Sequence, residues 1–423
     1  MNAKVEHWAT IGFDDAFDQI STTGKTVKTA GLPTEGSYPV IDQGQAPLAG
    51  FLDSPELVIS NESPIIIFGD HTRAVKWVDC PFIPGADGVK VLALREPLDA
   101  RFFYYHLRSL HLESKGYARH FSQVRDASYC LPPLAEQKRI AQKLDALLAQ
   151  VDTLKARIDA IPALLKRFRQ AVRASALKGD LLSDSKEDSS AWNECTLSDL
   201  ASVETGKTPD RSEANYWQAG SIPWVTSAAT GLSFCKEAKE FVTPLAMREC
   251  SLKLFSPGTL LLAMYGEGKT RGQVTELKIQ AACNQACAAI SVNGDLALQS
   301  FVKLRLEENY EAIRKMAVGG NQPNLNLGKV REIQFSLPSI ATQTEIVRRV
   351  EQLFAYADQL EAKVAAAQQR IDALTQSLLA KAFRGELVPQ DPSDEPASVL
   401  LERIRTQRAA APKPKRGRKA ATS

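Results

Sequence analysis

The sequence predicts an α+β protein in which two mixed α/β globular regions alternate with two long helices that pair as a coiled coil. Residues 131–182 align without a gap onto residues 337–388, and 16 of these 52 positions are identical. Apolar residues in both segments recur at alternating spacings of four and three, which is typical of a helical heptad seam. The regions upstream contain short strand-like apolar runs that end in loops rich in glycine and polar residues. The chain is therefore a tandem duplication of a variable globular region and a better-preserved helical region.

The repeat divides the 423-residue chain into six segments. The expected boundaries are residues 1–130 for the first globular region, 131–182 for the first helical spacer, 183–190 for a linker, 191–336 for the second globular region, 337–388 for the second helical spacer and 389–423 for a C-terminal segment. The last fifteen residues carry five Lys or Arg side chains among alanine and proline, which predicts a basic, disordered tail. A solvated tail is the ordinary interpretation, and a DNA minor-groove arm is the alternative.

The seam of the helical segments is narrow, so its natural partner is another helix, and the matching seam is the other copy. The seam residues are Ile140, Leu144, Leu147, Val151, Leu154, Ile158, Ile161, Leu165, Phe168 and Val172 in the first copy and Ile346, Val350, Leu353, Ala357, Leu360, Val364, Ala367, Ile371, Leu374 and Leu378 in the second. At about 1.5 Å per residue, such a pair makes a spacer of roughly 60 to 65 Å. Gly179 and Gly385 are expected to stop the helices, and Pro162 is expected to kink the first one.

Within the globular regions, the clearest elements are short. Strands are expected at residues 38–41, 65–69 and 259–264, and residues 221–226 run into another strand. Helical stretches are expected at residues 100–112 and 297–315.

Composition limits the classes of protein. With 44% hydrophobic and 24% charged residues the chain resembles ordinary globular protein. No apolar run approaches the roughly 20 residues of a membrane-spanning helix, and the N-terminus lacks a signal-peptide pattern, so we expect a cytoplasmic protein without a membrane partner. Seven scattered cysteines fit reduced thiols, and Cys283 and Cys287 are better explained by buried packing than by zinc. The net charge of +3 permits nucleic-acid binding without requiring it.

Motifs that would indicate an enzyme fail on inspection. Three Gly-Lys-Thr triplets, beginning at Gly24, Gly206 and Gly268, lack the earlier glycine of a phosphate-binding loop. A nuclease-like set of Pro209, Asp210, Glu237 and Lys239 is short, and solvated surface explains it better. The sequence therefore predicts no catalytic and no metal-binding residues.

Polar and basic loops after the strands suit contacts with phosphates and bases, although ordinary hydrophilic turns are the alternative for any single residue. The candidates for DNA binding are Lys25, Thr26, His71, Arg73 and Lys76 in the first region and Lys207, Thr208, Tyr216, Trp217, Lys269, Arg271, Asn321, Gln322 and Asn324 in the second.

These features resemble the DNA specificity subunit of type I restriction-modification systems along essentially the whole chain. The matching motifs are the openings LPPLAEQKRIAQKLD and LPSIATQTEIVRRVE, the closings ALKGDL and AFRGEL, GKTP with YW and IPWVT, GGNQPNLN, and residues 394–404. Their order and duplication carry the resemblance. The first region departs from the pattern, because GKTV replaces GKTP and no YW or NQPN loop is found there.

The resemblance implies two target-recognition domains in a pseudo-twofold tandem repeat, separated by two antiparallel coiled-coil helices, each domain reading one half of a bipartite double-stranded DNA target. It also implies partners: two modification subunits that carry S-adenosylmethionine and methylate adenine, and restriction/translocase subunits that use ATP and Mg. This chain itself would bind no cofactor.

Two other classes of function stay open at this point. One is a stand-alone nuclease built on Asp210, Glu237 and Lys239, and the other is a coiled-coil adaptor that binds only protein. A chain that retains specific DNA without metal-dependent cleavage would be a specificity subunit rather than a nuclease. Absence of any DNA preference favours the adaptor.

Overall fold

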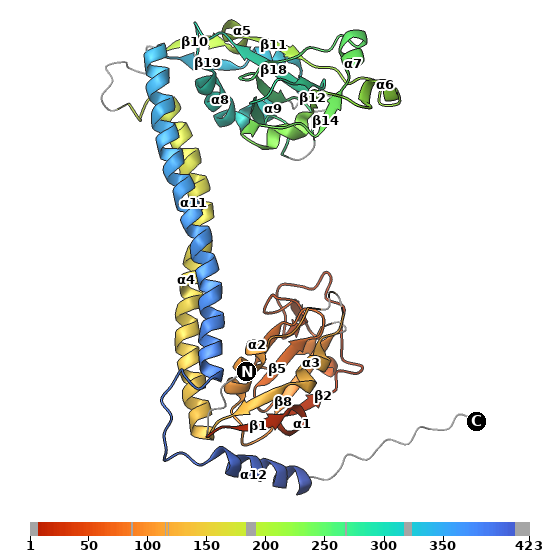
Figure 1. Cartoon of the computed structure of the whole chain (residues 1–423), viewed down its shortest axis with the longest axis vertical. Helices are drawn as coiled ribbons and strands as arrows, with labels where there is room; N and C mark the ends of the chain where they lie inside the picture. The colour runs from red at the N-terminus through yellow and green to blue at the C-terminus, as the bar shows by residue number, and fades with distance from the viewer. Residues whose placement is uncertain are drawn as a thin grey trace, which may run out of the picture. The chain divides into compact units, whose positions relative to one another are not determined.

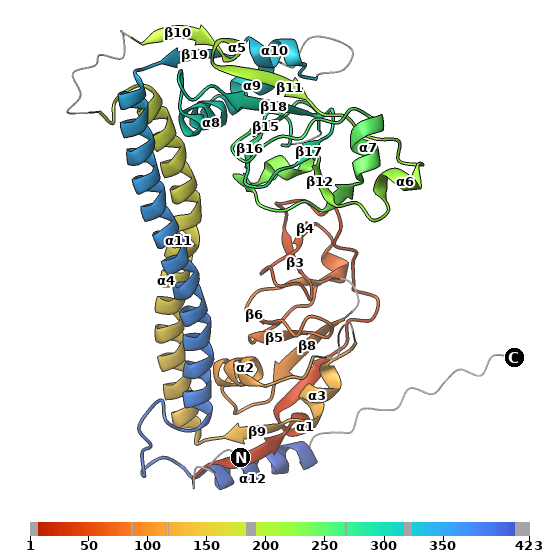
Figure 2. The ribbon, with the colours of Figure 1, turned by 45° about the horizontal axis from the view of Figure 1, so that its top comes forward.

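The computed structural model describes residues 7–85, 88–114, 116, 118–182, 192–266, 269–316 and 324–410. The chain forms two compact units, of which unit 1 comprises Met1–Asp159 and Ala366–Ser423, and unit 2 comprises Ala160–Ala365. Each unit contains one globular region together with part of each long helix. Figures 1 and 2 show the two long helices side by side.

The long helices are α4 (Leu134–Leu177) and α11 (Ile340–Phe383), each of 44 residues. In unit 1, Lys155 contacts Asp372 and Asp159 contacts Gln368, so the partner's number falls along α11 as the number rises along α4. In unit 2, Arg169 contacts Asp358 with the same sum of residue numbers. The helices are therefore antiparallel, with one register in both units.

Ten of the twenty predicted seam positions are buried, and eight more are half-buried. Ile140, Leu144 and Val151 of α4 are buried, as are Ile346, Val350, Val364 and Ile371 of α11. Half-buried positions between them are Leu147, Ile158, Leu353 and Leu360. Leu154 and Leu374 differ from the expectation, because their side chains are 48% and 45% exposed. The heptad pattern has two alternating rows of positions, and one row is therefore more completely buried than the other.

Both helix ends follow the prediction. Gly179 and Gly385 have φ values of 83° and 73°, a conformation that glycine adopts without steric cost. The next amide donates back to the helix in each copy, from Asp180 to Ser175 and from Glu386 to Lys381. A backbone hydrogen bond of this kind is typical of a helix that ends at a glycine. Helix α4 continues through Pro162.

Unit 1 has three sheets among its described residues, with strand orders β1-β9, β2-β8-β5-β6 and β4-β3-β7. The strands are β1 (Ala9–Gly12), β2 (Phe17–Ile20), β3 (Tyr38–Ile41), β4 (Gly50–Leu52), β5 (Ile65–Gly69), β6 (Val75–Val78), β7 (Ile83–Pro84), β8 (Val89–Leu94) and β9 (Ser128–Leu131). The shorter helices are α1 (Phe13–Ala16), the 3-10 helix η1 (Pro55–Leu57), α2 (Ala100–Ser109), α3 (Phe121–Asp126) and α12 (Ala397–Ala410).

Unit 2 repeats this arrangement among its described residues, with strand orders β10-β19, β11-β18-β15-β16-β13 and β14-β12-β17. The strands are β10 (Asn193–Thr196), β11 (Ala201–Thr205), β12 (Ile222–Val225), β13 (Phe234–Cys235), β14 (Glu240–Val242), β15 (Leu260–Ala263), β16 (Val274–Leu277), β17 (Ala282–Cys283), β18 (Cys287–Val292) and β19 (Gln334–Leu337). The shorter helices are α5 (Leu197–Leu200), α6 (Ala214–Trp217), the 3-10 helix η3 (Ser227–Gly231), α7 (Pro244–Glu249), α8 (Gln299–Glu308), α9 (Tyr310–Met316) and α10 (Leu327–Arg331).

One glutamine of each repeat ties the globular region to the long helix. Gln137 accepts from the Asp99 amide at 3.0 Å and donates to the Pro132 carbonyl at 2.9 Å. Gln343 accepts from the Leu298 amide at 2.8 Å and donates to the Pro338 carbonyl at 2.9 Å. Both side chains are fully buried. The identity at this position in the repeat therefore has a structural cause, because the amide satisfies buried backbone groups.

Apolar burial joins each globular region to the helices. In unit 1, Phe102 of α2 lies in one core with Leu144 of α4 and Phe383 of α11. In unit 2, Phe301 of α8 lies in one core with Ile346 of α11. Both phenylalanines are fully buried, and each contributes about 1.5 to 3 kcal/mol.

The expected short elements are largely present. Strands β3 and β5 have the predicted bounds, while β12, β15, α2 and the pair α8 and α9 lie within the predicted ranges or end one residue beyond them. Helix α12 was not anticipated. It packs on β1 and α1, with Leu400 and Ile404 in the unit 1 core. The basic tail from residue 411 lies outside the described residues.

Candidate nucleic-acid interface

Strand pairing in unit 2 gathers several loops at one end of the five-stranded sheet. Thr205, the last residue of β11, pairs with Ala288, and Ala263, the last residue of β15, pairs with Cys287. Because these strands are antiparallel, the loops that follow β11 and β15 lie beside the turn that precedes β18. The amide of Leu325 donates to the Met264 carbonyl at 3.2 Å, which adds the segment after residue 323. We call these loops the sheet-end surface of unit 2.

The basic candidates of unit 2 lie on this surface. Lys207 and Thr208 are exposed, and the Thr208 hydroxyl donates to the Gln285 side chain at 2.5 Å. Lys269 is exposed, and Arg271 and Asn324 are half-buried. Asn321 and Gln322 lie outside the described residues. The structure therefore brings Lys207, Thr208, Lys269, Arg271 and Asn324 to one sheet end.

The loop that carries Lys207 packs tightly against neighbouring parts of unit 2. A Cβ atom on Gly206 would lie 1.7 Å from the Cys283 carbonyl oxygen, so only glycine fits there without a backbone shift. Trp224 donates its indole N–H to the Lys207 carbonyl at 3.1 Å. The loop is thus preorganised, which lowers the ordering cost of binding.

Tyr216 and Trp217 of α6 are half-buried and hydrogen-bonded within the protein. The Tyr216 hydroxyl donates to Glu249 at 2.9 Å, which raises the pKa of Tyr216 to about 12. The Trp217 indole donates to the Asp210 carbonyl at 2.9 Å, and the guanidinium of Arg211 lies 4.0 Å from its ring centre. These contacts favour a role in holding the loop rather than in stacking on bases.

Unit 1 has an equivalent sheet-end surface. Ile20, at the end of β2, pairs with Val91, and Gly69, at the end of β5, pairs with Val89. The loops after both strands carry Lys25, Thr26, His71 and Arg73. Thr26 and Arg73 are exposed, while Lys25 and His71 are half-buried. Lys25 donates to the Val58 carbonyl at 2.7 Å, Arg73 to the Leu112 carbonyl at 2.9 Å, and the His71 amide to the Gln43 side chain at 3.1 Å.

Lys76 requires a correction. It lies in β6 with a side chain only 9% exposed, and its ammonium pairs with Asp42 at 3.2 Å. Burial lowers the pKa of Lys76, and Asp42 partly opposes that shift. A buried and paired ammonium is not available to a phosphate, so Lys76 has a structural role. Sequence alone does not reveal this, because Asp42 comes from a different loop.

Other polar residues of the sheet-end surfaces were missed. Gln285 is exposed beside Thr208, Tyr265 follows β15, and Gln43 lies beside His71. Their only signal in the sequence is a polar or aromatic residue next to a short apolar run. Strand pairing is needed to place them with the basic candidates.

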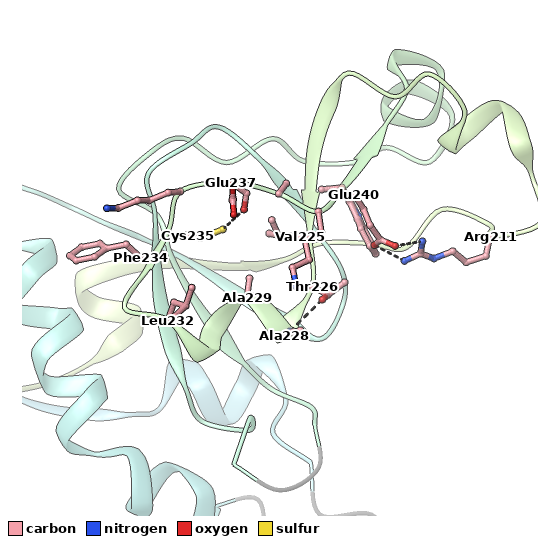
Figure 3. A pocket seen from close by; sticks show the side chains of 14 residues that line it. Arg211, Val225, Thr226, Ala228, Ala229, Leu232, Phe234, Cys235, Glu237 and Glu240 are labelled. Atoms are coloured by element: carbon pink, nitrogen blue, oxygen red, sulfur yellow. Dashed lines mark hydrogen bonds and ion pairs between the residues drawn. The ribbon is translucent and has the colours of Figure 1, made fainter. Parts of the chain in front are cut away.

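Unit 2 also contains a cavity of about 790 Å³, shown in Figure 3. Most of its lining comes from the segment between β12 and β14, including Leu232, Phe234 and Cys235. Arg211 and Glu240 form an ion pair at its edge, at 2.9 Å. None of the DNA candidates lines it. Two of its lining residues nevertheless contact candidates, because Arg211 lies over the Trp217 ring and Trp224 donates to the Lys207 carbonyl.

The residues of the alternative nuclease set do not form a cluster around a metal. Asp210 accepts hydrogen bonds from the backbone and hydroxyl of Ser212, which lower its pKa. Glu237 and Lys239 line the cavity of Figure 3, and Asp210 does not. Across the described ranges, no group of three or more His, Cys, Asp or Glu side chains is placed to hold a metal ion. No described helix is both long and apolar enough to cross a bilayer.

Comparison with known proteins gives a consistent family. The model of the type I restriction modification DNA specificity domain matches residues 189–367. The specificity subunit of the type I restriction enzyme EcoBI from Escherichia coli is 30% identical over 91% of this chain and 86% of its own length. The StySPI specificity subunit from Salmonella potsdam is 33% identical over 73% of this chain and 71% of its own length.

Solved structures show the same fold. A chain from a study of complex assembly and conformational transition of the type I R-M system aligns with a TM-score of 0.67 at 16% identity, covering 90% of this chain and 98% of that chain. The HsdS subunit from Thermoanaerobacter tengcongensis aligns with a TM-score of 0.54 at 16% identity and the same coverage. The members of this family are non-catalytic, and the catalytic activity lies in partner subunits. Similarity along nine tenths of the chain therefore establishes that this protein belongs to the DNA specificity subunits of type I restriction-modification systems.

Proposed function

We propose that the sheet-end surface of each unit reads one half of an asymmetric bipartite DNA target. The observation that supports this most is that strand pairing gathers polar and basic loops at one sheet end in both units. Their side chains differ: Lys207, Thr208 and Gln285 lie in unit 2, whereas Thr26, Gln43 and Arg73 lie in unit 1. Different side chains on a shared scaffold give half-sites of different sequence.

Phosphate and base contacts are divided among these residues. Lys25, Arg73, Lys207, Lys269 and Arg271 supply the positive charge for phosphates, with Thr26, His71, Thr208 and the amides of Asn321, Gln322 and Asn324 available for base edges. Tyr216 and Trp217 position the loop that carries Lys207. Helices α4 and α11, paired along their seam, link the two readers.

The chemistry comes from partners in this proposal. Two modification subunits carry S-adenosylmethionine and methylate adenine in each half-site, and restriction/translocase subunits use ATP and Mg to cleave unmodified DNA. The complex works in the cytoplasm, where the DNA is. The described residues offer no cluster for a metal, and the chain itself binds no cofactor in this scheme.

Sequencing of methylated adenines tests the proposal. Cells that express the modification subunits with this chain should carry methylation at one bipartite motif, and cells without the chain should not. The isolated chain should retain that DNA without turning over S-adenosylmethionine or cutting DNA. Metal-dependent cleavage by the isolated chain would support the nuclease reading, and methylation independent of the chain would contradict the proposal.

A further inference from the structure

The two units can be compared residue by residue where the globular region meets the long helix. Gln137 accepts from the Asp99 amide at the start of α2, and Gln343 accepts from the Leu298 amide at the start of α8. Counting from these anchors, Arg101, Tyr104 and Tyr105 correspond to Ser300, Lys303 and Leu304. This list of pairs also makes Phe102 equivalent to Phe301, and both are fully buried.

Strand register extends the comparison to the sheet edge. Trp77 of β6 faces Ile66 of β5, and Glu276 of β16 faces Leu260 of β15. Ile66 and Leu260 in turn face equivalent residues of β8 and β18. Trp77 therefore corresponds to Glu276. On the long helices, the repeat places Glu351 at the position of Asp145.

In unit 1 an arginine fills the space between α2, β6 and α4. The Arg101 guanidinium pairs with Asp145 at 2.7 Å. It lies 4.7 Å from the ring centre of Trp77 and 5.0 Å from that of Tyr104. Tyr105 donates to the same carboxylate. The carboxylate of Asp145 on α4 is thus paired within the chain. Its partner is an arginine whose guanidinium packs against aromatic rings.

In unit 2 the same place is open. Ser300 is exposed at the position of the arginine, and Leu304 replaces the tyrosine that reaches the carboxylate. Lys303 and Glu276 form an ion pair at 3.5 Å where unit 1 has Tyr104 against Trp77. A cavity of about 480 Å³ results, and we call it the α8–α11 groove. Its lining includes Leu304, Val347, Glu351 and Phe354.

The charges of the α8–α11 groove leave one carboxylate without a partner among the described residues. Glu276 is paired with Lys278 and Lys303, and Glu307 is paired with Arg173 at 3.1 Å. Glu351 is exposed and makes no ion pair or hydrogen bond with any described side chain. Glu351 is therefore the carboxylate of the groove that a further cation can pair with, and it lines the groove together with Leu304 and Val347. A carboxylate in this position disfavours nucleic-acid phosphate and favours a cation.

We propose that the α8–α11 groove binds an arginine side chain presented by a partner protein, with the guanidinium on Glu351 and the aliphatic stem against Leu304 and Val347. Unit 1 supplies the template, because Arg101 occupies the equivalent place from within the chain. The choice of partner rests on the proposed function: in a type I assembly it is a modification subunit. Docking of this kind is confined to unit 2, since unit 1 has already filled its site.

Two variants of the full chain test this by opposite means. Glu351→Gln removes the charge that receives the arginine. Ser300→Arg places an arginine in cis where Arg101 stands in unit 1, so it should occupy the groove and compete with the partner. Each should weaken binding of the cognate modification subunit about tenfold in titration calorimetry. Glu351→Gln should keep the wild-type melting temperature, and Ser300→Arg should raise it slightly.

Matched controls separate docking from folding. Glu332→Gln changes the same charge at an exposed position of unit 2 outside the groove and should leave affinity unchanged. Asp145→Asn should lower the stability of unit 1 without changing affinity, because its arginine is internal. A chain that ends at residue 410 should bind like the full chain. If removal of the tail abolishes the effect of Ser300→Arg, the occupant is the chain's own basic tail and the partner proposal is wrong.

The outcomes also separate this inference from the proposed function. If the wild-type complex methylates its bipartite target while Glu351→Gln and Ser300→Arg bind the modification subunit with wild-type affinity, the groove inference fails and the function stands. If the wild-type chain neither binds a modification subunit nor directs methylation, the function fails and the groove inference falls with it.

Discussion

The two globular regions have equivalent strands in the same order, but they differ in the side chains beside the long helix. Both have the same order of equivalent strands, and both anchor a helix on a buried glutamine, Gln137 or Gln343. Unit 1 closes the space beside its long helix with Arg101, Trp77 and Tyr104. Unit 2 leaves that space open and adds β13, an extra edge strand in the longer connection between β12 and β14.

The difference shows which residues a duplicated fold must keep. A buried amide that satisfies two backbone groups cannot change without leaving them unpaired. Side chains outside this buried contact can differ more between the two repeats. Trp8 donates to Glu136 at 3.0 Å, whereas the repeat places Thr342 at the position of Glu136, and the indole N–H of Trp192 has no acceptor among the described residues. The tryptophan is kept for packing even though its hydrogen bond is not.

Exchange of one globular region gives the largest expected effect. Replacing residues 191–336 with the equivalent segment of a relative should change one half of the methylated motif completely and leave the other half intact. The physical reason is that each sheet-end surface is built from strands of a single unit. Sequencing of methylated adenines measures this. A change in both half-sites would contradict the independence of the two units.

Removal of the shared glutamine tests whether the scaffolds are equivalent. Gln137→Ala and Gln343→Ala should each destabilise their own unit by about 3 kcal/mol, because each leaves a buried N–H and a buried C=O unpaired. Denaturant unfolding followed by hydrogen exchange assigns the loss to a unit. A cost near zero for one variant would show that the two units do not depend equally on this contact.

Acid should affect the units differently. Burial lowers the pKa of His106 to about 4, and its ring accepts from the Cys130 amide at 2.8 Å. Because the folded-state pKa is depressed, the stabilisation is present above the unfolded pKa of about 6.5 and is lost as pH falls toward 4. Unit 1 should lose about 2 to 3 kcal/mol across this window.

The equivalent position in unit 2 is Arg305, which pairs with Glu308 at 3.3 Å. Hydrogen exchange at the Cys130 amide against pH follows the effect in unit 1. His106→Gln keeps an acceptor without a titrating ring and should remove this pH dependence. Its persistence in that variant would assign the effect to other groups.

The smallest expected effect concerns single lysines. Lys207→Ala should lower the slope of log affinity against log salt by about 1, because one phosphate contact is lost. Lys76→Ala is the matched control. It should leave the slope unchanged and lower the stability of unit 1, since it leaves Asp42 without its ion-pair partner. Equal slopes for both variants and the wild type would remove Lys207 from the interface.

Sequence predicted the parts of the fold that depend on local pattern. The seam, the glycine stops and strands β3 and β5 follow from residue spacing and turn chemistry, which act over a few residues. Leu154 was placed in the seam by the same rule, but spacing does not say how closely the opposite helix approaches. Helix α12 was missed because residues 397–410 have no equivalent in the first repeat to draw attention to them.

The candidate site was less accessible to sequence for a physical reason. Lys76 and Arg73 both look like basic loop residues, yet one is buried against Asp42 and the other is exposed. Burial depends on strand pairs that join residues far apart in the chain. Gln285 was overlooked for the same reason, because only pairing of β11 with β18 places it beside Thr208.

The division of the chain also sets an order of synthesis. Unit 2 is continuous, from residue 160 to residue 365, whereas unit 1 is assembled from both ends of the chain. At about 5 to 20 residues per second, the ribosome needs about 10 to 40 s to make unit 2. Throughout that time, Phe102 and Leu144 lack Leu379, Phe383 and Leu400, the residues that complete their core. Although its first residues emerge first, unit 1 therefore completes its core only after α11 and α12 have been made, and its apolar face stays uncovered until then.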